Sequence, residues 1–297
     1  MSKINFHGDD VAFSPPHKAL FHILPVPLEK TVSYLGGTQH GPQALLEASC
    51  QLELFDGKSI PAEYGIYTAD PLDCSPTIEK VLNDLQEKVS STLEHRGIPI
   101  VLGGEHSLSL ACVKGLKQHS DDFGVIQFDA HADLRNSYDG SLHSHASVMR
   151  RIYEEDIPIC QIGTRSYCLE EHLLRRENNI FFCDAETIWQ KGIEAVSLPA
   201  DFPEKIYITF DVDCFDTSLM PATGTPVPGG LHWHQVTEIL RSLFRDRLCL
   251  GFDLVELSPQ TGMHGATFTV AQLAYNMMGY LVRSAKNKTY YSLSDVP

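Results

Sequence analysis

Short apolar segments of strand length alternate with helix-like segments along most of this 297-residue chain. Continuous apolar runs are typical of strands buried on both faces, as in parallel sheets whose helical connections cover both sides. The runs lie at Ile98 to Leu102, Gly124 to Phe128, Ile157 to Ile162, Ile180 to Phe182, Ile206 to Phe210 and Leu248 to Phe252. The alternation predicts the α/β class: a single three-layer α/β/α domain over residues 1–297, with a mostly parallel central sheet.

The helix expected before Ile98 has the clearest pattern. Its apolar residues recur at spacings of three and four: Ile78, Val81, Leu82, Leu85, Val89 and Leu93. Such spacing predicts an amphipathic helix. Ser75 and Pro76 are predicted as its N-cap and first-turn residue. Further helices are expected at Pro42 to Leu52, Leu108 to Gln118, Ala146 to Tyr153, His232 to Phe244 and Val270 to Arg283.

The charge balance narrows the choice of partners. The chain has 23 Lys and Arg against 38 Asp and Glu, a net charge of −15 at pH 7. A chain this acidic, without a run of basic residues, is repelled by phosphate backbones and by anionic lipid. We therefore expect neither nucleic acid nor a membrane as a partner, and favour a small cationic molecule.

Neither export nor a disulfide scaffold is expected. The first 16 residues contain no apolar stretch of the kind found in secretion signals, and the apolar runs are too short to cross a bilayer. The eight cysteines are scattered without a CxxC pair, which predicts reduced and mostly buried thiols. We expect a soluble, cytoplasmic protein.

Acids and histidines follow three of the apolar runs directly. Ligands of open α/β sheets bind outside the carboxyl ends of the strands. The polar residues at these ends are His106, Asp129, His131, Asp133, Asp211 and Asp213. Residues two apart in extended backbone point the same way, so Asp129, His131 and Asp133 project together if strand geometry persists. The two histidines and four aspartates are expected to converge.

Four carboxylates in one small pocket repel one another unless protons or cations neutralise them. Two divalent metal ions would supply the matching charge. Oxygen-rich ligands with one imidazole for each metal favour Mn²⁺, although nickel, iron and cobalt stay open. Metals held in this way activate water for attack on an electrophilic carbon.

These clusters resemble the signature blocks of the ureohydrolases, the family of arginase and agmatinase. The blocks are GGEHS around His106, FDAHAD at 128–133, and TFDVD followed by PATGTPVPGG between 209 and 230. A fourth block, GFDLVELSP at 251–259, is also similar, so the resemblance covers the chain from about residue 98 onward. Thr217 departs from the proline usual in the family, but it lies outside the expected ligands.

The resemblance implies an arginase-like fold and two Mn²⁺ ions per chain. One metal would be bound by His106, Asp129, Asp133 and Asp211, and the other by His131, Asp129, Asp211 and Asp213. Asp129 and Asp211 would therefore bridge the two ions. The family also implies a homotrimer or homohexamer.

The resemblance further implies catalytic and substrate-binding residues. Glu256, in VELSP, would pair with the substrate guanidinium, because a carboxylate matches a planar fork of donors. Asp133 would orient the attacking water and stabilise the tetrahedral intermediate. Thr225 is similar to a hydroxyl on the substrate side. His145 is favoured over His143 as the histidine that protonates the leaving amine, and His143 is kept as a substrate-binding candidate.

The expected substrate is agmatine, hydrolysed to putrescine and urea. The stretch 165–170 lacks the acids with which arginases hold an α-amino group, and Arg135 stands where arginases tend to have asparagine. Glu105 differs from the glycine that formiminoglutamases usually carry before the histidine. Guanidinobutyrase, guanidinopropionase, arginase and formiminoglutamase activities remain as alternatives.

Three hypotheses other than a ureohydrolase activity have less support in the sequence. A non-catalytic binding subunit would be expected to have lost metal ligands, whereas all six residues are present. A two-metal phosphoesterase needs cationic or backbone groups for phosphate, and the motif blocks contain few. Cys168 as a covalent nucleophile has no identifiable paired base.

Overall fold

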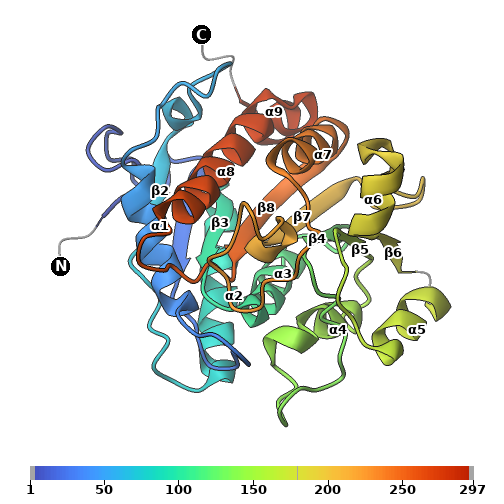
Figure 1. Cartoon of the computed structure of the whole chain (residues 1–297). Helices are drawn as coiled ribbons and strands as arrows, with labels where there is room; N and C mark the ends of the chain where they lie inside the picture. The colour runs from blue at the N-terminus through green and yellow to red at the C-terminus, as the bar shows by residue number, and fades with distance from the viewer. Residues whose placement is uncertain (1–3, 179, 294–297) are drawn as a thin grey trace.

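The computed structural model describes residues 4–178 and 180–293. Within this part of the chain, the strands form one parallel eight-stranded sheet in the order β2-β1-β3-β8-β7-β4-β5-β6 (Figure 1). The strands are β1 (Phe21–Val26), β2 (Ile66–Thr68), β3 (Ile98–Gly103), β4 (Gly124–Phe128), β5 (Ile159–Ile162), β6 (Phe181–Cys183), β7 (Lys205–Asp211) and β8 (Leu248–Val255). This is the predicted α/β class.

The six predicted strands are confirmed, with ends that move by up to three residues. Two strands were not predicted. β1 carries His22 and Pro25 within its apolar run, and β2 has only three residues. β1 nevertheless pairs with both β2 and β3, and the Pro25 carbonyl accepts a hydrogen bond from Leu72 N at 2.9 Å. Burial on both faces overrides the weak local signal.

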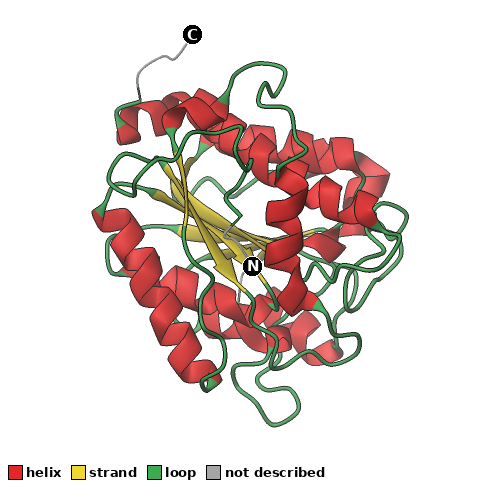
Figure 2. Ribbon diagram, turned by 90° about the vertical axis from the view of Figure 1, so that its left-hand side faces the viewer, coloured by secondary structure: helices red, strands yellow, loops and turns green. Residues whose placement is uncertain are grey.

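Helices cover both faces of the sheet, as Figure 2 shows. They are α1 (Gly41–Ser49), α2 (Ile78–Glu94), α3 (Ser109–Lys117), α4 (Val148–Tyr153), α5 (Leu169–Glu177), α6 (Ala185–Lys191), α7 (Trp233–Asp246), α8 (His264–Arg283) and α9 (Ala285–Tyr291). One apolar core joins the sheet to α1, α6, α7 and α8, and a second joins the opposite face to α2, α3 and α4. The predicted three layers are therefore confirmed.

Several helix boundaries differ from the predictions. α2 begins at Ile78 with Thr77 as its N-cap, so Ser75 and Pro76 precede the helix. α8 begins at His264 rather than Val270. The helices α5, α6 and α9 were not predicted, because they are short and their polar composition gives little apolar periodicity.

The eight cysteines are free thiols, five of them buried, in agreement with the prediction. Among the described residues, no helix is both long and apolar enough to cross a membrane. The sheet order has a direct consequence for function. It places β3, β8, β7 and β4 side by side, so the polar residues that follow these four strands meet at one edge.

Candidate active site

The six predicted metal ligands come together at the carboxyl ends of β3, β7 and β4. Two groups of side chains have ligand atoms within 4.8 Å of one another: His106 with Asp129 and Asp133, and His131 with Asp129 and Asp213. Asp129 belongs to both groups, and Asp211 lies beside the first, with Oδ2 3.5 Å from His106 Nδ1.

The convergence does not arise from extended backbone, as the spacing of two had suggested. β4 ends at Phe128, and Asp133 has a left-handed φ of 52°. Aspartate tolerates this region better than most residues. The Asp133 carbonyl accepts hydrogen bonds from Met149 N at 3.0 Å and Arg150 N at 3.2 Å, which ties the bend to the start of α4. A bent loop, rather than strand alternation, aims Asp133 at the cluster.

His106 provides the clearest test of whether a metal ion fits. Its Nδ1 is buried, lies 3.1 Å from both Asp129 Oδ2 and Asp133 Oδ2, and makes no hydrogen bond within the described residues. A buried nitrogen without a hydrogen-bond partner is rare in proteins. A cation among these carboxylates would satisfy it, and imidazole with carboxylate is a suitable donor set for a divalent transition metal.

The other ring nitrogen of His106 is held in place by a buried chain of polar groups. Thr209 Oγ1 donates to Asp253 Oδ1 at 2.7 Å, and it lies 2.8 Å from His106 Nε2. Because the single threonine proton goes to Asp253, the threonine oxygen accepts from His106 Nε2–H. Nδ1 is then the nitrogen with a free lone pair, which is the arrangement that metal ligation needs. Tyr207 donates to the second oxygen of Asp253 at 2.8 Å.

The second group is built around His131. Its Nδ1 lies 3.0 Å from Asp213 Oδ2 and 3.6 Å from Asp129 Oδ1. The second oxygen of Asp213 is held by the backbone, since Asp213 Oδ1 accepts from Ala130 N at 3.0 Å. The neighbouring Asp211 is held in the same way, with Oδ1 accepting from Asp213 N at 2.9 Å. One oxygen of each carboxylate is thereby fixed by the fold, and the other faces the cluster.

The electrostatics of the two groups agree with a cation site. Burial lowers the pKa of His106, but three carboxylates outweigh this effect and hold the pKa well above its usual value. Burial and the Asp129 carboxylate together raise the pKa of Asp133 to about 7. Burial also raises the pKa of Asp211 well above its usual range. The site therefore concentrates more negative charge than its own residues neutralise, a situation that bound cations relieve.

Glu256 follows β8 and is buried next to the first group, with a left-handed φ of 64°. Its Oε1 accepts a hydrogen bond from His106 N at 2.7 Å, and its own N donates to Gly104 O at 2.8 Å. A side chain at position 104 would collide with the Leu28 carbonyl, so the second glycine of GGEHS is sterically required. Burial first, and the neighbouring carboxylates second, raise the pKa of Glu256 to about 8.

His145 lies at the start of a short 3-10 turn (His145–Ser147) and reaches the site through Thr31. Its backbone N donates to Thr31 Oγ1 at 3.0 Å, and its ring Nδ1 lies 3.3 Å from the same oxygen. Thr31 Oγ1 in turn donates to Glu105 Oε1 at 2.9 Å, and Glu105 is fully buried. Burial lowers the pKa of His145.

A cavity of about 170 Å³ lies between these residues. Its walls are formed by Ser33, His131, Asp133, Arg135, Tyr138, His145, Ala146, Asp211, Thr225 and Glu256. His143 is not among them, although His145 is, so the structure brings only one of the two candidate histidines to the cavity. Thr225 lies at the wall, as its predicted role requires.

The stretch 165–170 does not line this cavity. The Arg165 guanidinium donates to backbone carbonyls, including Asp213 O at 2.7 Å and Val227 O at 2.7 Å, so it stabilises the loop after β7. Cys168 is the N-cap of α5, at the end of the predicted polar loop, and does not line the cavity. Cys168 therefore does not face the residues with which a covalent mechanism at this site would need it to act.

The comparisons with known proteins agree with this geometry. A sequence profile of the Arginase family matches residues 19–279. The chain belongs to the Arginase family. An N(1)-aminopropylagmatine ureohydrolase from Synechocystis is 37% identical over 276 residues, covering 90% of either chain. An agmatinase from Pyrococcus horikoshii is 35% identical, covering 88% of this chain and 92% of the other. This family membership confirms the resemblance found in the motifs.

A solved structure supports the Arginase-family fold. The agmatine ureohydrolase of Thermoplasma volcanium matches with a TM-score of 0.84 at 27% identity, covering 98% of this chain and 97% of the other. The family consists of ureohydrolases that act on guanidino compounds. The two His/Asp groups are accordingly sites that could hold metal ions.

Sequence reasoning missed the supporting residues Thr209, Asp253 and Thr31. Thr209 and Asp253 lie inside motif blocks, on β7 and β8, where they replace apolar residues in otherwise buried strands. A polar residue within an apolar strand indicates a buried hydrogen bond, because an unpaired polar group is costly to bury. Such a residue could therefore have been predicted to support the site. Thr31 carries no such signal, since it lies in an irregular loop.

Proposed function

We propose that the protein is a binuclear metal-dependent hydrolase that removes urea from a linear guanidino amine, with agmatine or its N1-aminopropyl derivative as substrate. The observation that carries this proposal is the cavity itself. One wall is formed by residues of both metal-binding groups, and another by Glu256, a buried carboxylate that belongs to neither group. A guanidinium bound to Glu256 would therefore lie next to the metal ligands.

The metal ions and three residues of the chain would have separate roles in the proposed reaction. Two divalent ions, Mn²⁺ being favoured, would supply Lewis acidity and activate water at neutral pH. Glu256 would bind the guanidinium through charge-assisted hydrogen bonds and orient its carbon. Asp133 would accept a proton and orient the attacking oxygen, and His145 would protonate the leaving amine.

Two features favour a substrate without an α-amino acid group. The stretch 165–170, where arginases place acids for the α-amine, contributes nothing to the cavity wall. The net charge of −15 also attracts a dication over a zwitterion. The names of the relatives at 35–37% identity add support for agmatine and its aminopropyl derivative.

One observation favours a second candidate, guanidinobutyrate. Arg135 lines the cavity and its guanidinium lies 5.3 Å from the centre of the Tyr138 ring. A cation at this position attracts a substrate carboxylate and repels a second substrate amine. Guanidinobutyrate carries such a carboxylate at the end away from its guanidinium.

A substrate panel tests both candidates. Protein saturated with Mn²⁺ is incubated with agmatine, N1-aminopropylagmatine, guanidinobutyrate and arginine, and urea is measured. We expect kcat/KM for the two amines to exceed that for arginine by several orders of magnitude, because an unpaired substrate carboxylate in a buried site is costly. A preference for guanidinobutyrate would select the second candidate. Absence of urea from all four compounds, with two metals bound, would reject the hydrolase.

A further inference from the structure

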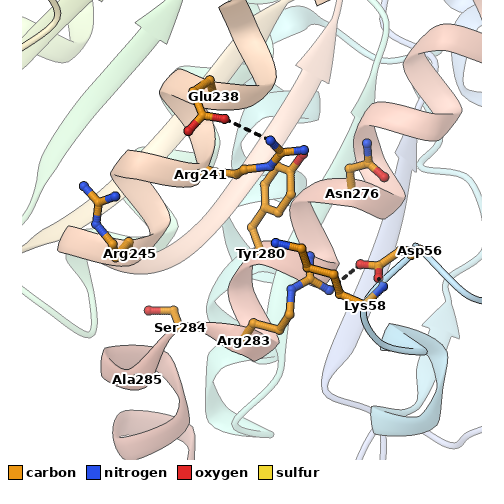
Figure 3. Close-up of a pocket in the computed structure, with 11 residues that line it drawn as sticks. Asp56, Lys58, Glu238, Arg241, Arg245, Asn276, Tyr280, Arg283, Ser284 and Ala285 are labelled. Atoms are coloured by element: carbon orange, nitrogen blue, oxygen red, sulfur yellow. Dashed lines mark hydrogen bonds and ion pairs between the residues drawn. The ribbon is translucent and has the colours of Figure 1, made fainter. Parts of the chain in front are cut away.

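A second and larger cavity, of about 580 Å³, lies away from the catalytic one and shares no residue with it. Figure 3 shows its walls, which come from the loop around Asp56, from α7 and from the end of α8. α7 leads into the start of β8, and the helix after α8 hydrogen-bonds to the same strand start through Asn287 and Cys249 N at 3.1 Å. The cavity therefore lies toward the amino ends of the strands, opposite the metal ligands.

Cations gather in this cavity. Lys58, Arg241, Arg245 and Arg283 all line it, although the whole chain has only 23 Lys and Arg and a net charge of −15. The guanidinium carbons of Arg241 and Arg283 lie 5.4 Å and 5.7 Å from the centre of the same Tyr280 ring. Bringing several like charges together costs free energy unless anions lie between them.

Among the described residues, each of the three wall arginines pairs with one acid, and Arg245 does so through two hydrogen bonds of 2.8 Å to Asp246, outside the wall. Arg241 NH1 donates to Glu238 at 2.9 Å, and Arg283 forms an ion pair with the buried carboxylate of Asp56. Each guanidinium has five N–H donors in a fixed fork, so one acid accounts for only part of them. Asp56 also accepts from Ser59 N at 2.8 Å, so the same contact anchors the loop to α8.

A second, independent observation points to a missing acceptor. Ser284 lines the cavity, and its hydroxyl is buried and has no hydrogen-bond partner within the described ranges 4–178 and 180–293. The residue is only 6% exposed. A buried hydroxyl without a partner is unfavourable, and an oxygen of a bound ligand would relieve it.

From these contacts we infer that this cavity is a binding site for a small phosphate-bearing anion. Arginine forks match phosphate oxygens, and a serine hydroxyl can donate to a further oxygen of the same group. The volume is within the range of small-molecule sites and exceeds the need of inorganic phosphate alone. The inference is independent of the proposed hydrolase activity, because no residue of the catalytic cavity takes part.

Binding is tested by calorimetry on the full-length, metal-loaded protein. The probes are inorganic phosphate, pyrophosphate and a nucleoside diphosphate, each compared with sodium chloride at equal ionic strength. We expect saturable binding of at least one probe, with one site per chain. Heat no larger than that of chloride for every probe would overturn the inference.

Two variants locate the binding site. Arg245→Gln removes an exposed cation that hydrogen-bonds to Asp246 and Ser242 of its own helix, and Ser284→Ala removes a hydroxyl that has no hydrogen-bond partner among the described residues, so neither should disturb folding. Each should weaken probe binding by about five- to twentyfold. For the arginine this is the usual effect of losing a charge-assisted hydrogen bond, and for the serine it is the upper end of the effect of losing a neutral hydrogen bond. Arg176→Gln, which removes an exposed charge on α5, is the matched control and should leave binding unchanged.

The remaining outcomes also decide the matter. Binding that weakens equally in Arg245→Gln and Arg176→Gln would reflect overall charge and would reject the site. Binding unaffected by both Arg245→Gln and Ser284→Ala would place the anion elsewhere and reject it too. A change of subunit number in Arg245→Gln, measured by light scattering, would make the cluster an interface between copies and would overturn the inference.

Discussion

His106 Nε2 lies 2.8 Å from Thr209 Oγ1, and this contact sets which ring nitrogen of His106 faces the carboxylates. The Thr209 proton goes to Asp253, so the threonine oxygen accepts from the imidazole. The lone pair on His106 Nδ1 is thereby directed at Asp129 and Asp133. The Thr209 hydroxyl contacts His106 at Nε2, not at the ligand atom Nδ1, yet it orients the ring so that Nδ1 can bind a metal ion.

The first prediction concerns this contact. Thr209→Val keeps the shape of the side chain but removes the acceptor for His106 Nε2–H. Metal affinity should fall by about ten- to a hundredfold, the usual effect of losing such a supporting partner. Thr209→Ser keeps the hydroxyl and should retain near-normal affinity. Competition with a chelator measures the affinity, and equal affinities for the valine and serine variants would contradict the role assigned to the hydroxyl.

The second prediction concerns Asp129, which belongs to both His/Asp groups. Protein loaded with manganese should contain nearly two ions per chain. Asp129→Ala should lose both or nearly both, because each group loses a carboxylate. Elemental analysis after desalting gives the stoichiometry. Full activity with a single ion per chain would exclude the binuclear site.

The third prediction separates Glu256 from the metal ligands. Glu256→Gln keeps the shape but removes the charge that the guanidinium requires. Metal content should stay unchanged while kcat/KM for agmatine falls by roughly tenfold to a few hundredfold, the kinetic equivalent of about 1.5 to 3 kcal/mol or slightly more. Asp213→Asn is the contrast and should weaken metal binding first. Loss of metal from Glu256→Gln, or near-native turnover, would show that Glu256 does not hold the guanidinium.

The fourth prediction uses the positive charge of Arg135 in the catalytic cavity. Arg135→Gln should raise kcat/KM for the dication agmatine and lower it for guanidinobutyrate, each by about fivefold, since a partly solvated charge pair is worth about 1 kcal/mol. Raising the salt concentration should shrink both effects. Arg176→Gln removes a distant charge and should change neither substrate. Parallel changes for the two substrates would mean that Arg135 acts on packing rather than on substrate charge.

The fifth prediction concerns stability at acid pH. His7 is buried against the rings of Phe6 and Tyr275, and burial lowers the pKa of His7 to about 4 against a weaker opposing effect of Asp10. Between pH 6.5 and 4, His7 is protonated in the unfolded chain but not in the folded protein. The free energy of unfolding therefore falls as the pH drops from 6.5 toward 4. The loss is at most about 3 kcal/mol.

His7→Asn should remove this part of the pH dependence. Asparagine does not titrate and tolerates the left-handed φ of 64° at this position. The variant loses ring packing and should be less stable at every pH, but the gap to the unchanged protein should narrow between pH 6.5 and 4. Urea unfolding at several pH values in this range measures the free energy of unfolding of both proteins. Because both carry the same metal site, its pH dependence cancels in the comparison. A gap independent of pH would contradict the effect.

The residues at the cavity differ in how far the sequence could predict them. Asp129, Asp133 and Asp213 follow apolar runs within a few residues, so local pattern and the rule for parallel sheets were enough to expect them together. Thr31 reaches His145 across 114 residues, and nothing near it in the chain indicates a role. Its contact depends on how a loop folds back over the site.

The amino-acid sequence by itself determined the α/β class, the order of most strands and helices, and the set of acids and histidines at the strand ends. These follow from burial periodicity, which is local in the chain. Tertiary structure decided the rest. It added β1 through pairing with its neighbours, bent Asp133 and Glu256 into left-handed backbone, and brought His145 rather than His143 to the cavity. Each of these depends on contacts between residues distant in the chain, whose free energy no short window of sequence contains.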